Sequence, residues 1–227
     1  MPAQINILSA GAVSPGLVKV IEAFRRETDH DVKVTFATAP ELRKRMGSGE
    51  SPDVVVGPPD LLDQLAKSGH AAAERVTVGR IGVGAMVRDG APVPRIATVD
   101  EFKQALLNSQ SIVFNQASTG LYIESLFKRL GIAAETEAKI TRYADFAAVR
   151  DHVANGHGSE IGFGATTVII ETARQSLRYI GPLPAELQNY TTYTAALTAN
   201  AGYAARALLR YLAAPAATAI FTAAGIQ

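Results

Sequence analysis

The feature that most constrains the fold of this chain is an apolar strand that runs through a turn of small residues into an amphipathic helix, within residues 5–24. Residues 5–8 form the strand, and Leu17, Ile21 and Phe24 recur at the spacing of one helix face. The turn between them, residues 9–12, can bring backbone N–H groups to the positive end of a helix, where anions bind. We therefore interpret this turn as one wall of an anion site, although an ordinary strand-to-helix turn has the same pattern.

This arrangement is repeated along the chain. Strands at residues 30–36 and 53–56 are each followed by a helix. A strand at residues 111–114 leads through a small polar turn into another helix, which repeats the opening arrangement. Strands that alternate with helices pair in parallel and are joined by right-handed crossovers. The sequence therefore predicts an α/β fold.

The rest of the chain continues this alternation. A strand at residues 81–87 begins a second series, and its glycines suggest that another backbone approaches closely. Thr98 and Glu101 form a capping box that predicts where the next helix begins. Residues 181–189 have little periodicity and are interpreted as a connection. The further predicted strands are 139–141, 160–163, 177–180 and 190–197, and the predicted helices are 41–46, 60–67, 99–107, 144–154, 166–173, 201–212 and 214–223.

Composition excludes several classes of protein. Of the 227 residues, 48% are hydrophobic and 19% are charged, which is typical of a globular chain. The net charge of +1 gives no electrostatic reason to expect a nucleic-acid partner. There is no cysteine, so thiol catalysis and disulfides are excluded, and no apolar run approaches the ~20 residues of a membrane span. No signal peptide precedes the first strand, so we expect a cytoplasmic protein, or a periplasmic one whose leader has been removed.

Several stretches resemble the molybdate-binding, ModA-like family of periplasmic solute-binding proteins, and the resemblance extends over nearly the whole chain. They are INILSAGAV, VTFATAPELRKRMGSGESPDVVVGPP, STGLYIESLFKRLGI and VANGHGSEIGFG. A further stretch, GPLPAELQNYTTYTAAL, resembles a subgroup usually described only as substrate-binding proteins. The resemblance implies the type II periplasmic-binding-protein fold, with two α/β lobes, two crossover segments and a ligand cleft. Lobe one would be residues 1–80 with 190–227, and lobe two would be residues 81–189.

The departures from this family fall at the expected ligand site. The molybdate binders have serines in the first two strand-to-helix turns, where this chain has Ala12 and Ala39, and a tyrosine where it has Gly164. Each missing partner of a desolvated oxyanion costs roughly 1–3 kcal/mol. We therefore expect molybdate to bind poorly and a small di- or tricarboxylate to bind better.

The candidate ligand-binding residues lie where predicted strands end and helices begin. Arg45 is a weak candidate partner for a carboxylate, since its basic run is also typical of a solvated helix face. Tyr122 fits either the core or the rim of the site. If the lobes face each other, the turns at residues 9–12 and 118–120 would both point at one anion. The candidates are Ser9, Ala10, Gly11, Ala12, Thr38, Ala39, Arg45, Asn115, Ser118, Thr119, Gly120, Tyr122, Tyr143 and Gly164.

Two classes of function fit this pattern. The first is a binding protein that takes a small anion to a transporter, with an ABC-type permease as its membrane partner. The second is an enzyme, because some ModA-like proteins are aconitate isomerases, which shift an allylic proton and need a general base. His30, His157 and Glu160 stand at the wrong ends of strands and His152 lies within a helix, so no base is evident. No cofactor and no metal site is expected, because no cluster has metal-ligand spacing.

Overall fold

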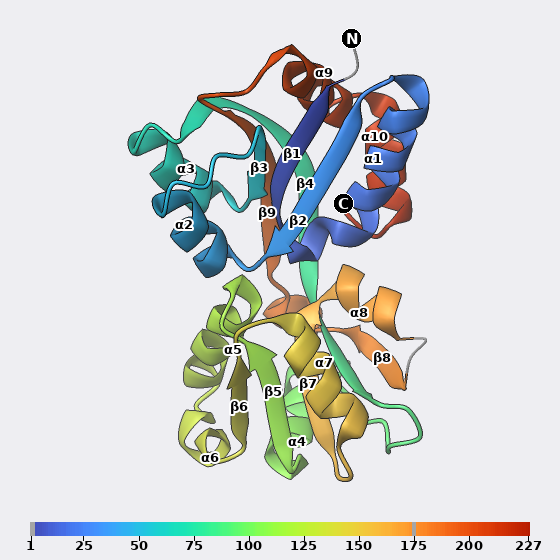
Figure 1. Cartoon of the computed structure of the whole chain (residues 1–227). Coiled ribbons are helices and arrows are strands. Elements are labelled where there is room, and N and C mark those ends of the chain that lie inside the picture. Colours follow the sequence, from blue (N-terminus) through green and yellow to red (C-terminus); the bar gives the residue numbers. More distant parts are fainter. Residues whose placement is uncertain (1–2, 174–175) are drawn as a thin grey trace. The chain divides into compact units, whose positions relative to one another are not determined.

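The computed structural model describes residues 3–173 and 176–227, in which helices and strands alternate along the chain (Figure 1). The chain divides into two compact units. Unit one comprises Met1–Ile81 and Thr191–Gln227, and unit two comprises Gly82–Tyr190. The hydrogen-bonded strand order is β2-β1-β3-β9-β4-β7-β5-β6, with β8 also paired to β4. The predicted α/β class is confirmed.

Unit one contains three parallel strands, β1 (Gln4–Ala10), β2 (Asp31–Ala37) and β3 (Val54–Gly57), and β9 (Tyr190–Thr198) runs antiparallel to β3. Helices cover both faces of this sheet: α2 and α3 lie on one side, and α1 and α10 on the other (Figure 1). The helical elements are η1 (Gly11–Val13), α1 (Ser14–Glu27), α2 (Ala39–Gly47), α3 (Pro59–Lys67), α9 (Tyr203–Leu212) and α10 (Pro215–Ala223).

Local sequence determines where α1 begins, and burial determines which of its faces packs against the sheet. Pro15 stands in its first turn, where the missing N–H costs nothing. Leu17, Ile21 and Phe24 are all buried, as their spacing predicts. Burying a side chain of this size contributes about 1.5–3 kcal/mol, so this face fixes α1 against the sheet and places its N-terminus directly after β1.

Unit two is built on β5 (Ser111–Asn115), which pairs in parallel with β6 (Ile140–Tyr143) and with β7 (Glu160–Ala165). The long strand β4 (Ala71–Arg88) runs antiparallel to β7 and to β8 (Leu177–Pro182). Two hydrophobic clusters form its core, one with Phe102, Phe127 and Phe163 and the other with Val149 and Ile169. Its helices are α4 (Val99–Asn108), α5 (Ser118–Arg129), α6 (Ala133–Glu137), α7 (Phe146–Asn155), α8 (Thr166–Thr172) and η2 (Ala185–Leu187).

The largest differences from the sequence prediction are an earlier strand start, an additional helix and a 3₁₀ turn. Strand β4 begins at Ala71, ten residues before the expected start at residue 81. Its first half was not predicted because it is mostly half-buried and has no apolar alternation. The short helix α6 was not predicted, since its five residues are too few for a periodic pattern. The connection at residues 181–189 includes the 3₁₀ turn η2.

Candidate functional site

Three parallel strands of unit one end at the same edge of the sheet, and each is followed at once by a helix. The register pairs Ala10 with Ala37 and Ser9 with Val56, so the strand ends are aligned. The residues before η1, α2 and α3 are Ala10, Thr38 and Pro58, and each lacks a side-chain capping hydrogen bond. The first N–H groups of a helix have no partner within the helix. This edge therefore presents three helix N-termini without side-chain caps.

The turn after β1 is the best placed of the three to hold an anion. The first turns of η1 and α1 have no acidic residue, whereas α2 has Glu41 and α3 has Asp60 in the first turn. A helix N-terminus carries about half a unit of positive charge, which a neighbouring carboxylate offsets. A Cβ atom at Gly11 would have no atom within 4 Å, so the space beside this turn is open.

The side chains at this edge contribute less than its backbone. Ser9 is fully buried, and its hydroxyl donates to the carbonyl oxygen of Ala10 at 3.2 Å. Thr38 and Ala39 are half-buried at the start of α2, beside the end of β1. Ala12 adds no hydroxyl to this edge, so the donors here are chiefly main-chain N–H groups.

A similar edge occurs in unit two, where β5 and β6 end with Asn115 paired to Tyr143. The Asn115 side chain accepts from the Ala117 N–H at 3.2 Å, which shapes the turn before α5. Ser118 and Thr119, both half-buried, begin α5, which has neither a side-chain cap nor an acidic residue in its first turn. By contrast, α7 is capped by Asp145, whose carboxylate accepts from the N–H of Ala148 at 2.9 Å. The N-terminus of α5 thus has the same character as that of η1.

Gly120, a candidate ligand-binding residue, packs closely against the end of the preceding strand. A Cβ atom at this residue would lie 1.6 Å from the carbonyl oxygen of Asn115 and 2.9 Å from the Phe114 ring. The absence of a side chain lets α5 start against the end of β5. A larger residue here would displace the strand end, so it would not report on access of an anion.

Two candidates with functional side chains are held by protein partners. Arg45 lies in the last turn of α2 and binds Glu50 through two nitrogens, at 2.5 and 2.7 Å. This hydrogen bond raises the pKa of the Arg45 guanidinium above its ordinary value. Tyr122 donates to the carbonyl oxygen of Leu187 at 2.7 Å and accepts from Arg129 at 3.1 Å. We therefore assign both side chains structural roles.

The last two candidates face inward. The Tyr143 hydroxyl lies 2.9 Å from Nδ1 of His152, and the two rings pack edge to face. A Cβ atom at Gly164 would lie 2.5 Å from the ring of Phe146, so this glycine makes room for an aromatic side chain. The sequence correctly placed both residues at strand ends, but it could not show which side chains pack around them.

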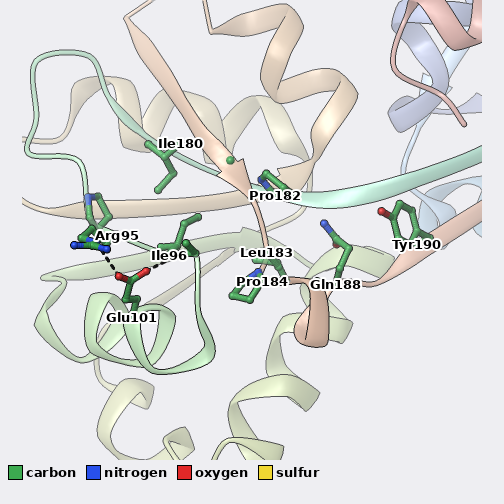
Figure 2. A pocket seen from close by; sticks show the side chains of 13 residues that line it. Arg95, Ile96, Glu101, Ile180, Pro182, Leu183, Pro184, Gln188 and Tyr190 are labelled. Carbon is green, nitrogen blue, oxygen red and sulfur yellow. Dashed lines mark hydrogen bonds and ion pairs between the residues drawn. The ribbon is translucent and has the colours of Figure 1, made fainter.

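Sequence reasoning missed a pocket of about 670 Å³ in unit two, between the loop before α4 and the segment after β8 (Figure 2). Among the described residues that line the pocket, Arg95 is the basic one, and its guanidinium pairs with the Glu101 carboxylate at 2.7 Å. Gln188 makes two hydrogen bonds of 3.0 Å to the backbone of Val83. Because these polar groups already have partners, the pocket is poorly suited to an anion. No sequence signal marked it, since residues 181–189 lack periodicity.

Two classes of feature are absent from residues 3–173 and 176–227. No helix there has the length and apolarity needed to cross a lipid bilayer. His, Asp and Glu side chains in these ranges do not gather in any group of three or more that could hold a metal ion.

Comparison with known proteins gives one family and many structural neighbours. The family described as bacterial extracellular solute-binding protein matches residues 5–227. An aconitate isomerase from Pseudomonas sp. is 31% identical over 220 residues, which cover 92% of this chain and 82% of that protein. The periplasmic molybdate-binding protein of Azotobacter vinelandii superposes with a TM-score of 0.80 at 19% identity, covering 98% of both chains. The sulfate-binding protein SubI of Mycobacterium tuberculosis gives 0.77 at 16% identity, covering 99% of this chain and 86% of that one. Identities this low show a shared fold.

Proposed function

This chain belongs to the bacterial extracellular solute-binding protein family, as its resemblance to ModA-like proteins predicted, and we propose that it binds a small di- or tricarboxylate anion. The observation that carries this proposal is the edge of unit one, where three helices begin without side-chain caps. Backbone N–H groups at a helix N-terminus bind anions without a cationic side chain. Ser9 to Ala12, with Thr38 and Ala39, are the residues proposed to form this site.

Carboxylates suit this edge better than a tetrahedral oxoanion. The family's molybdate binders use serine hydroxyls in turns where this chain has Ala12 and Ala39. The Ser9 hydroxyl is buried and already donates to a carbonyl oxygen. The hydroxyl donors that a tetrahedral dianion would use are therefore missing from these two turns. The relative named aconitate isomerase supports a ligand with several carboxylates.

Isothermal titration calorimetry tests this proposal with molybdate, tungstate, sulfate, cis-aconitate, trans-aconitate and citrate. We expect at least one carboxylate to bind clearly more tightly than the three oxoanions. Sub-micromolar binding of molybdate would overturn the assignment.

A matched pair of variants locates the site. Gly11→Val places a branched side chain in open space beside the N-terminus of η1, where no protein atom lies within 4 Å of the new Cβ. We expect carboxylate affinity to fall about tenfold or more, which corresponds to ~1.4 kcal/mol or more. Gly202→Val is the control, because Gly202 also has open space at a helix start, but follows β9 at the opposite edge of the sheet. Equal affinities of the two variants would place the ligand elsewhere.

A second candidate function is isomerisation of aconitate. It is favoured by the 31% identity to an aconitate isomerase over 92% of this chain. The reaction moves a proton between two carbons of an allylic system, so it requires a base within reach of the substrate. Incubation with trans-aconitate in D₂O, followed by NMR, would detect both cis-aconitate and deuterium at the exchanging carbon. Tight binding without either product would identify a binding protein, whose proposed partner, if the chain is exported, is an ABC-type permease.

A further inference from the structure

We infer that the hydroxyl group of Tyr193 belongs to the anion site at the carboxyl edge of unit one and donates a hydrogen bond to a ligand carboxylate. This inference rests on the proposed function, and it adds a residue that the strand-to-helix turns do not contain. The argument depends on where β9 places the residue, which way its side chain points, and the state of its hydroxyl group.

Strand pairing places Tyr193 at the correct edge. In the antiparallel pair of β3 and β9, Val56 lies opposite Ala195 and Gly57 lies opposite Thr194. Gly57 is the last residue of β3, so Tyr193 stands one residue beyond the final pair. This is the edge at which β1 and β2 also end and at which η1 begins.

The alternation of side chains shows which face Tyr193 occupies. A Cβ atom at Gly57 would lie 2.9 Å from Leu61 of α3, so Gly57 and its partner Thr194 face α2 and α3. Tyr193 must therefore point to the other face, which α1 covers (Figure 1). Ser9, paired with Val56, points to this face as well. The Tyr193 ring thus shares a face and an edge with the turn that leads into α1.

Tyr193 is buried, but its hydroxyl has no partner among the residues that the structure describes. Tyr193 is 6% exposed, and the hydroxyl makes no hydrogen bond within residues 3–173 and 176–227. Three completely enclosed side-chain atoms in those ranges lack a partner: Nε of Arg75, Nε of Arg88 and Oε2 of Glu160. The Tyr193 hydroxyl is not one of them, so it is not completely enclosed. The ring is therefore packed while the hydroxyl tip remains reachable, an arrangement in which a buried tyrosine usually meets a polar partner.

Burial also keeps this group in the form of a donor. It raises the pKa of Tyr193 from 10.0 to about 12, so the phenol stays protonated at neutral pH. A protonated phenol can donate to a carboxylate oxygen, and such charge-assisted bonds are stronger than neutral ones. An anionic ligand would supply the acceptor that the protein does not.

Tyr193→Phe tests the inference, because it removes the hydroxyl and keeps the ring. We expect the affinity for the carboxylate that binds wild type best to fall about tenfold in calorimetry, the scale of one hydrogen bond to a charged group. Tyr211→Phe is the control: its hydroxyl donates to Glu27 at 2.7 Å from α9, so its loss should leave affinity unchanged. Melting temperatures of all three proteins confirm folding.

Tyrosine fluorescence supplies a second measurement, since the chain has seven tyrosines and no tryptophan. Ligand binding should change the emission of wild type and of Tyr211→Phe, and this change should be reduced in Tyr193→Phe. If wild type binds a carboxylate and Tyr193→Phe binds it equally well, the inference alone is wrong. If wild type binds none of the carboxylates, the proposed function and the inference both fail.

Discussion

At the scale of single residues, glycines at helix starts divide into two kinds, which predicts different consequences of substitution. A Cβ atom at Gly120 would lie 1.6 Å from the carbonyl oxygen of Asn115, whereas one at Gly11 would meet nothing within 4 Å. Forcing a methyl group against the backbone costs about 3 kcal/mol, at the upper end for overpacking. Gly120→Ala should therefore lower the melting temperature by about 6–12 °C, and Gly11→Ala should change it little. A wild-type melting temperature for Gly120→Ala would contradict this geometry.

Sequence could identify which residues lie at strand ends, but not how their side chains are used. The periodic apolar pattern placed Tyr143 and Gly164 near the ends of β6 and β7, where the structure has them. The hydrogen bond between Tyr143 and His152 depends on the packing of α7 against β6, which no local pattern encodes. Tyr193, whose hydroxyl we infer to bind the ligand, was missed for a similar reason, because its place at this edge comes from the register of β9 against β3.

At the scale of elements, the predictions that succeeded rest on local chemistry. The capping box at the start of α4 is confirmed: the Thr98 hydroxyl accepts from the Glu101 N–H at 3.2 Å, and the Glu101 carboxylate accepts from the Ala97 N–H at 3.0 Å. The first half of β4 was missed because its alanines and charged residues do not alternate between apolar and polar with a period of two. Its extended conformation depends on pairing with distant strands, which a single sequence does not display.

The helices differ in whether a side chain caps their first turn. The sequence supplies side-chain caps to α4 and α7, through Thr98 and Asp145. It supplies none to η1, α2, α3 and α5, which follow strands that end at a carboxyl edge. A missing cap typically costs about 1 kcal/mol of stability. Side-chain caps are also absent from α9 and α10, which begin elsewhere, and α7 is capped although it follows β6, so a missing cap does not by itself mark a ligand site.

At the scale of the whole molecule, ligand binding must appear as added stability, because a ligand that binds only the folded chain shifts unfolding by mass action. At a concentration of 100 times Kd, this gain is about 2.7 kcal/mol, which for a chain of this length corresponds to a rise of roughly 5–10 °C in melting temperature. We expect a rise of this size with the carboxylate that binds best in calorimetry, and little change with molybdate at the same concentration. Differential scanning calorimetry would measure both. Without ligand, Gly11→Val should have the same melting temperature as unliganded wild type, and the carboxylate should not raise that temperature. A larger rise with molybdate, or an undiminished response of Gly11→Val, would show that the anion is held by groups other than the uncapped helix starts of unit one.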